Sequence, residues 1–373
     1  MRAHCAWAGL LVVLTGAAAA VPAPPQQPAH GPGGADYRHG EVKAAVHGKV
    51  PAEYWLFAPA APVPKTAPVV VFLHGWGAMS PEPYRAWIDH IVRRGNIVIY
   101  PLYQIGFGTP VAQFTPNALA AVGNALEFLR SAASPVAPDL KRFAVVGHSM
   151  GGVLAANLAA RAEARGLPRV SAFMSVQPGR TRMVGRRLAF QLEDLSQIPP
   201  STLLLTVAAD RDRIVRDGDA RRIYLETSQV PPSNKNFVLV ASDAYGYPPL
   251  EAHHFAPLAR AGSVAPPLSQ GRRISGERER MLERGAARGD RQPDPTRADS
   301  PDEDELPDVG LATVAVPDAL DFFGYWKLFD GLTDAAFYGR NREYALGNTP
   351  KQRYMGAWSD GRQVKELVIS GAP

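Results

Sequence analysis

The sequence predicts an α/β protein built on a doubly wound, mostly parallel sheet. Short apolar runs alternate with helical stretches through residues 41–260, a pattern that requires crossover connections between parallel strands. The runs are apolar along their whole length, which is typical of strands that helices cover on both faces. One run passes through the glycine-rich turn 147–151 directly into a helical stretch. Together these observations favour one α/β domain over 41–260.

The elements of this domain follow in order along the chain. Apolar runs predict strands at 54–57, 69–73, 97–100, 143–146, 170–176, 202–207 and 237–241. Helical spacing of apolar residues predicts helices at 81–94, 118–130, 153–158 and 219–227. The stretch between the strands at 170–176 and 202–207 is short, so it predicts only a small cap above the sheet and a comparatively open cleft.

Segments of different composition surround this core. Residues 1–23 join a basic start, an apolar run and a small-residue ending, which predicts a secretory signal peptide. The Pro- and Gly-rich residues 24–40 predict a flexible leader. Residues 261–313 are crowded with charges and hold no aromatic residue, which predicts a disordered insertion because such a segment buries too little apolar surface to fold.

Residues 314–373 are expected to complete the same domain with helical structure. Four aromatic residues in this part follow helical spacing and predict a helix that packs on the core: Phe322, Tyr325, Trp326 and Phe329.

Cysteine content and charge exclude several functions. Cys5 is the one cysteine and lies inside the predicted signal peptide, so the exported chain has neither a disulfide nor a thiol nucleophile, and its core must stabilise it. The formal net charge is +5, without a basic stripe interleaved with aromatic residues, which argues against a nucleic-acid partner. We expect a secreted or periplasmic protein with no integral membrane span after cleavage. Its oligomeric state is left open.

Ser149 is the candidate nucleophile. It occupies the centre of Gly-His-Ser-Met-Gly, between a predicted strand and a predicted helix. This strand–turn–helix context is that of a nucleophile elbow, in which glycines two residues either side let the chain reverse sharply and lift the serine above the sheet.

An acyl transfer also needs two N–H donors for the oxyanion that forms at the substrate carbonyl. We expect them to be the backbone N–H of Met150, directly after the serine, and that of Trp76, in the loop that follows the strand at 69–73. Trp76, Tyr103 and Tyr245 are the candidate substrate-binding side chains.

The acid and the base should follow the serine in that order along the chain. The loop after 202–207 offers two carboxylates, and we favour Asp212, which lies deeper in the loop, over Asp210. The loop after 237–241 offers an adjacent histidine pair, and we favour His254 over His253. The pair does not predict a metal site, because neighbouring side chains point apart and no third ligand has zinc-like spacing.

Over about residues 41–260 the chain resembles secreted α/β-hydrolases of the dienelactone-hydrolase and cutinase-like esterase group. The resemblance rests on residues 74–77, 147–151, 209–215 and 252–257. The acid loop of that group, Gly-x-x-Asp-x-x-Val, places its acid on Asp212, with Ala209 in place of the glycine. Its His-Phe-x-Pro loop matches His254-Phe255-Ala256-Pro257.

The resemblance implies an α/β-hydrolase fold and hydrolysis of a small-molecule or polymeric carboxylic ester by Ser149, His254 and Asp212, without a metal or organic cofactor. An acyltransferase, an amidase or peptidase, and a non-catalytic binding protein of the same fold are the alternatives. The residues do not reveal which acyl and alcohol groups bind.

Overall fold

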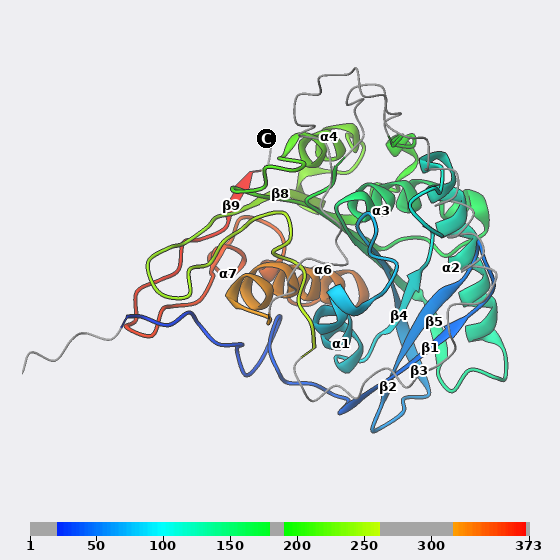
Figure 1. Ribbon diagram of the computed structural model, residues 1–373, viewed down its shortest axis with the longest axis horizontal. Helices are drawn as coiled ribbons and strands as arrows, with labels where there is room; N and C mark the ends of the chain where they lie inside the picture. Colours follow the sequence, from blue (N-terminus) through cyan, green and yellow to red (C-terminus); the bar gives the residue numbers. More distant parts are fainter. Residues whose placement is uncertain (1–20, 180–189, 262–315, 371–373) are drawn as a thin grey trace, which may run out of the picture.

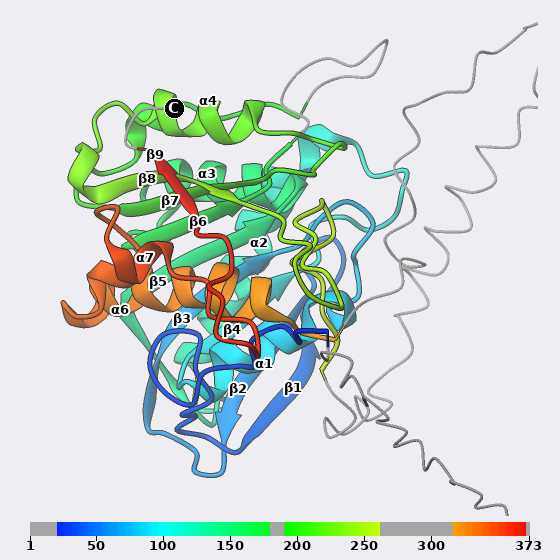
Figure 2. The ribbon, with the colours of Figure 1, turned by 90° about the vertical axis from the view of Figure 1, so that its left-hand side faces the viewer.

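The computed structural model describes residues 21–179, 190–261 and 316–370. Within these residues, nine strands form one sheet in the order β1-β2-β4-β3-β5-β6-β7-β8-β9. The strands are β1 (Glu41–His47), β2 (Tyr54–Ala60), β3 (Thr66–Leu73), β4 (Ile97–Pro101), β5 (Ala137–His148), β6 (Ala172–Val176), β7 (Leu203–Ala209), β8 (Lys235–Val240) and β9 (Val368–Ser370). Figure 2 shows them stacked from β9 at one end to β1 at the other.

The sheet is parallel at its centre and antiparallel at both ends. β4, β3, β5, β6, β7 and β8 pair in parallel, whereas β1 with β2, β2 with β4, and β8 with β9 are antiparallel. The predicted α/β class with a mostly parallel sheet is therefore confirmed. The carboxyl ends of the central strands meet at one edge, where ligands bind in open α/β sheets.

Helices cover both faces of the sheet (Figure 1). The α-helices are α1 (Arg85–Arg93), α2 (Phe114–Arg130), α3 (Met150–Arg161), α4 (Gly218–Glu226), α6 (Lys327–Tyr338) and α7 (Pro350–Arg353). α1 and α6 pack on one face, and α2 and α3 pack on the other. Side chains of one strand alternate between the two cores, as Val70 and Phe72 do against Val69 and Val71, which explains why the strands are apolar throughout.

Two edge strands were not expected from the sequence. β1 alternates exposed and half-buried residues, because successive side chains of a strand point to opposite faces and only one of them is covered here. Its mixed composition therefore contains no apolar run. β9 adds a strand beside β8, so the C-terminal part is not helical alone. The aromatic helix begins as a π-helical turn at Leu320–Trp326 and continues as α6, with Tyr325, Trp326 and Phe329 buried.

The segment predicted as a flexible leader packs against the C-terminal part of the chain instead (Figure 1). In this segment the Gly33 N–H donates to Asp330 Oδ2 at 2.7 Å, and just before it the N–H of Ala23, the last residue of the predicted signal peptide, donates to Ser359 Oγ at 2.9 Å. These partners lie more than 290 residues away in the sequence, so composition alone gave no sign of them. The predicted signal peptide and the charged insertion lie almost wholly outside the described residues, as do residues 180–189 of the predicted cap.

Asp330 is a buried charge that joins three parts of the fold. Its Oδ2 accepts from the Gly33 N–H, from His90 Nε2 at 2.9 Å and from Arg94 Nε at 3.2 Å. Burial by itself would raise the pKa of this carboxyl, but Arg94, His90 and the Gly33 N–H outweigh burial and hold the pKa below its ordinary value. The carboxylate is therefore ionised and satisfied in the folded state.

Replacing Asp330 by alanine is expected to lower the free energy of unfolding at pH 7 by about 3–5 kcal/mol, because a buried cation loses its partner. The depressed pKa contributes stability above about pH 4 that is lost as the pH falls through the folded-state value, so the variant should also lose less stability on acidification. Urea unfolding at pH 7 and at pH 3–4 measures both effects. Asp217→Ala, which breaks an exposed pair with Arg221, is the control and should cost under about 1 kcal/mol. Equal losses in the two variants would contradict this role.

Among the described residues no helix is both long and apolar enough to cross a membrane.

Candidate active site

Ser149 lies at the sharp turn between β5 and α3. Its backbone has φ 57° and ψ −122°, a left-handed conformation that a residue with a side chain rarely adopts. A Cβ on Gly147 would lie 2.0 Å from the Gly151 carbonyl oxygen, and one on Gly151 would lie 2.1 Å from that of Leu73. Glycines are thus required at both positions, and they let the chain place Ser149 at the carboxyl edge of the sheet.

The Ser149 hydroxyl contacts His254, and His254 contacts Asp212. His254 Nε2 lies 3.0 Å from Ser149 Oγ, and His254 Nδ1 lies 2.8 Å from Asp212 Oδ2. All three side chains are buried. Since the imidazole carries its proton on the nitrogen that faces the carboxylate, Nε2 is free to accept from the hydroxyl.

The Asp212 carboxylate is held as an anion. Its Oδ1 accepts from the N–H groups of Ile214 at 2.9 Å and Val215 at 3.0 Å. Burial would raise the pKa of Asp212, but the bonds to His254, Val215 and Ile214 bring the pKa below its ordinary value. An ionised, fixed carboxylate is what a neighbouring imidazolium needs for stabilisation.

The alternative acid and base lie near this group and do not join it. Asp210 accepts from the Ser242 N–H at 2.9 Å and the Ser242 hydroxyl at 2.6 Å, so it ties two loops together. His253 is exposed, and its Nδ1 accepts from the Phe255 N–H at 3.1 Å. The two side chains thus have different environments, and only His254 of the pair contacts Ser149.

The loop after β3 runs directly beside Ser149. A Cβ on Gly75 would lie 3.4 Å from the Ser149 Cβ, and the Gly77 N–H donates to Gln104 Oε1 at 2.8 Å. Trp76 lies between these two residues. Met150 is the first residue of α3, so its N–H has no partner inside the helix. The expectation that these two N–H groups bind the oxyanion stays a prediction.

A hydrogen-bonded chain that sequence patterns did not predict joins this loop to the candidate base, His254. The Gly75 N–H donates to the Tyr84 hydroxyl at 3.0 Å, which in turn donates to His148 Nδ1 at 2.8 Å. His148 Nε2 therefore carries the proton and donates to the His254 carbonyl oxygen at 2.8 Å. Burial and the neighbouring His254 lower the pKa of His148 to about 3, so His148 is neutral and keeps this arrangement at physiological pH.

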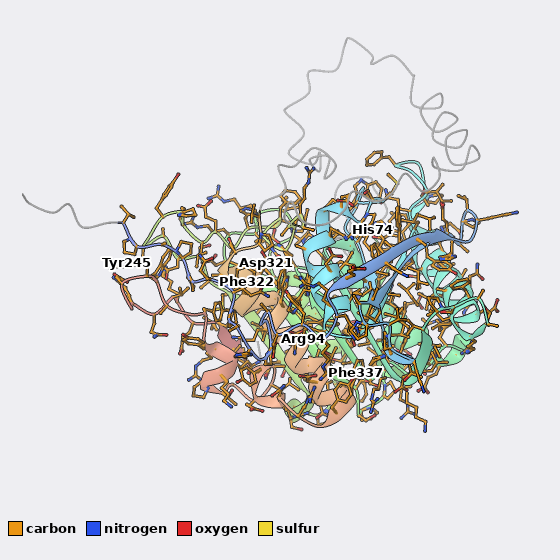
Figure 3. All side chains as sticks on the ribbon, turned by 90° about the horizontal axis from the view of Figure 1, so that it is seen from below. His74, Arg94, Tyr245, Asp321, Phe322 and Phe337 are labelled. Carbon is orange, nitrogen blue, oxygen red and sulfur yellow. The ribbon has the colours of Figure 1, made fainter. Side chains whose placement is uncertain are left out.

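The candidate substrate-binding side chains separate into three environments. Trp76 is half-buried and directly follows Gly75, the residue on which a Cβ would lie 3.4 Å from the Ser149 Cβ. Tyr103 is fully buried, stacks on His74 with ring centroids 4.1 Å apart and donates to the His74 carbonyl oxygen. It therefore stabilises the loop that follows β3. Tyr245 donates to Asp360 at 2.7 Å, and Figure 3 shows it at the left end of the molecule, well apart from His74, which lies nearer the centre. Neither tyrosine offers a surface to a substrate at Ser149, because one is enclosed and the other is remote.

An aromatic row leads from the core to the surface next to the site. The Trp76 ring lies 5.7 Å from the buried Phe114 ring and 6.4 Å from that of Phe107, which is 53% exposed. On the other side of the serine, Phe255 is half-buried and packs edge-on against His254 at 5.3 Å. The site is thus flanked by apolar rings. Over the described residues, no group of three His, Cys, Asp or Glu side chains is arranged to hold a metal ion.

The mostly parallel sheet, the strained serine between β5 and α3, and acid and histidine loops after β7 and β8 define the α/β-hydrolase fold. The model of the chlorophyllase family matches residues 33–193. This similarity covers less than half of the chain, includes Trp76 and Ser149, and ends before Asp212 and His254. It indicates an ester hydrolase of the α/β-hydrolase type. The search of curated proteins gave no match to this chain.

Proposed function

We propose that this protein is an exported serine hydrolase that cleaves carboxylic esters through an acyl-enzyme. The observation that carries the proposal is the continuous contact from Ser149 Oγ through His254 to Asp212, with distances of 3.0 and 2.8 Å. A serine hydroxyl becomes a useful nucleophile when a base accepts its proton and a carboxylate orients that base.

The reaction has two halves. Ser149 Oγ attacks the ester carbonyl while His254 Nε2 takes its proton, and the carbonyl oxygen becomes an oxyanion that the N–H groups of Trp76 and Met150 stabilise. His254 then gives the proton to the leaving alcohol, and the acyl group remains on Ser149. Water, deprotonated by His254, attacks the acyl-enzyme and releases the acid, while the proton returns to Ser149. Asp212 stays ionised throughout and stabilises the imidazolium.

The match to the chlorophyllase family indicates an ester hydrolase and thereby supports an ester over an amide substrate. The substrate of this chain is a small-molecule or polymeric ester. The predicted signal peptide at residues 1–23 supports export to the periplasm or the medium.

A substrate panel tests the proposed function. Purified protein is assayed on p-nitrophenyl esters of increasing acyl length, on a matched p-nitroanilide, and on an ester in the presence of competing alcohols or amines. We expect ester turnover to exceed anilide turnover and water to be the main acceptor. Acyl transfer as the main outcome would establish a transferase, and faster anilide cleavage an amidase. Inactivity on every substrate would contradict the proposal.

The exposed Phe107 ring beside Trp76 is expected to bind the apolar part of the ester. Phe107→Ala should raise KM for an octanoate ester by about 10-fold while that for acetate changes by less than about two-fold, since burying one aromatic ring contributes about 1–2 kcal/mol. Phe128, a half-buried ring that contacts His47 away from the site, gives the control variant Phe128→Ala. A uniform change across acyl lengths would show that Phe107 does not select the substrate.

A further inference from the structure

Gln177 follows β6 and is fully buried at the edge of the sheet that carries Ser149. Its φ is 44°, so it shares with Ser149 the left-handed conformation that side chains disfavour. The two residues follow neighbouring parallel strands, and the Ser149 N–H donates to the carbonyl oxygen of Val176, the residue before Gln177. Two residues with this disfavoured backbone conformation thus lie side by side. The proposed reaction gives a role to Ser149 but none to Gln177.

The Gln177 amide uses both of its hydrogens on the candidate acid and base loops. Nε2 lies 3.1 Å from Asp212 Oδ2 and 3.0 Å from the His253 carbonyl oxygen. Asp212 Oδ2 is the same oxygen that contacts His254 Nδ1 at 2.8 Å. One amide group therefore fixes both the carboxylate oxygen that faces the imidazole and the backbone just before that imidazole.

Tyr325 sets the direction of this amide. Its hydroxyl is 3.4 Å from Gln177 Oε1 and acts as the donor, since an amide oxygen only accepts. Turning the amide over would place its oxygen against the carboxylate and the carbonyl, two groups that cannot donate. The orientation with Nε2 toward Asp212 is thus determined by three separate contacts.

The tyrosine comes from the part of the chain that follows residue 315. Tyr325 is fully buried and belongs to the π-helical turn at Leu320–Trp326, a geometry frequent at functional sites. Asp321, on the same turn (Figure 3), and Asp318 lie close enough to act on the hydroxyl. Burial, followed by these carboxyls, raises the pKa of Tyr325 well above its ordinary value, so the hydroxyl stays protonated and remains a donor.

We propose that Gln177 and Tyr325 are positioning residues for the reaction: Gln177 orients Asp212 and the His254 loop, and Tyr325 holds Gln177. The inference rests on the proposed function, because it concerns the same nucleophile and base. Through Tyr325, the C-terminal part of the chain thereby takes part in activity.

Gln177→Met tests this role, because methionine has a similar volume and no N–H group. We expect kcat for a p-nitrophenyl ester to fall by about 10- to 100-fold with KM within about two-fold, since a small displacement of the base slows chemistry without altering binding. The rate at which a fluorophosphonate labels Ser149 should fall by a similar factor. Tyr325→Phe, which removes one oxygen atom, should lower both rates by about 2- to 10-fold.

Gln352→Met is the matched control. Gln352 is also fully buried, and its amide donates to Asn236 near the start of β8, at the end of the sheet away from Ser149. It should lower the melting temperature while leaving kcat and labelling unchanged. If Gln177→Met lowers the melting temperature in the same way and keeps wild-type kcat and labelling, the inference is wrong. If Gln177→Met does not fold, unchanged rates in Tyr325→Phe overturn it.

The same measurements distinguish an error in the proposed function from an error in the role of Gln177. A wild-type protein that is labelled by the fluorophosphonate but inactive on esters would contradict the proposed substrate, and the labelling rates of the variants would still test Gln177. A wild-type protein that is neither labelled nor active would overturn both.

Discussion

Ser149→Ala is expected to lower kcat/KM for p-nitrophenyl butyrate by about 10⁴-fold or more, because removal of the nucleophile of a Ser-His-Asp arrangement leaves only oxyanion stabilisation and binding. The hydroxyl makes one contact, to His254, so its loss should change the melting temperature by less than about 2 °C. Steady-state assays and thermal unfolding of the same preparation measure both quantities.

The matched control is Ser175→Ala, one strand away. Ser175 is also buried, but its hydroxyl donates to the Gly152 carbonyl oxygen at 2.6 Å and not to His254. This variant should lose stability and retain turnover. Residual activity of Ser149→Ala above a few per cent of wild type would show that another group attacks the ester.

His254→Ala should reduce kcat by about 10⁴-fold or more, comparable to loss of the serine, because the two residues act as one unit. The double variant with Ser149→Ala should therefore be hardly slower than either single variant. This non-additivity has a direct physical reason, since the base accelerates nothing once its proton donor is gone. Single and double variants assayed on one ester provide the measurement.

His253→Ala is the control that the chain itself offers. The His253 side chain is exposed and its Nδ1 accepts from the Phe255 N–H, whereas the bond to Gln177 uses the backbone carbonyl, which alanine keeps, so we expect kcat to stay within about three-fold of wild type. A large loss in His253→Ala together with an active His254→Ala would reverse the assignment of the base.

The sequence was sufficient for the α/β fold and for the strand–turn–helix context of Ser149. Both depend on local features, namely apolar runs and glycines two residues from a serine. The sequence only favoured Asp212 over Asp210 and His254 over His253. It could not decide between them, because the answer depends on how two loops approach one another in space. In the structure, Asp212 and His254 are 42 residues apart in sequence and 2.8 Å apart at their contacting atoms.

The supporting residues could not have been inferred from spacing. Tyr84 reaches His148 across 64 residues, and Tyr325 reaches Gln177 across 148. Aromatic residues at helical spacing predict a core helix, which is correct for Tyr325 as far as burial is concerned. The direction of its hydroxyl depends on the π-helical turn, and no pattern of apolar residues encodes that geometry.

Tyr103 and Tyr245 were predicted to bind substrate, and the structure places both away from it. Each follows a strand that ends at the edge of the sheet carrying the site, which made both plausible substrate contacts. The structure turns Tyr103 beneath the His74 loop and carries Tyr245 to the C-terminal loops, where it packs edge-on against Trp358. A strand end places a loop, but the direction in which the loop leaves decides what its side chains can touch.

The central claim is that Ser149 is the activated nucleophile, and covalent labelling tests it most directly. Folded wild-type protein is treated with a fluorophosphonate, and its intact mass and peptide map are then determined. We predict one adduct per chain, on the peptide that contains Ser149, with no adduct in Ser149→Ala and strongly slowed labelling in His254→Ala. An unlabelled wild-type protein, or an adduct at any other residue, would contradict this account of the site.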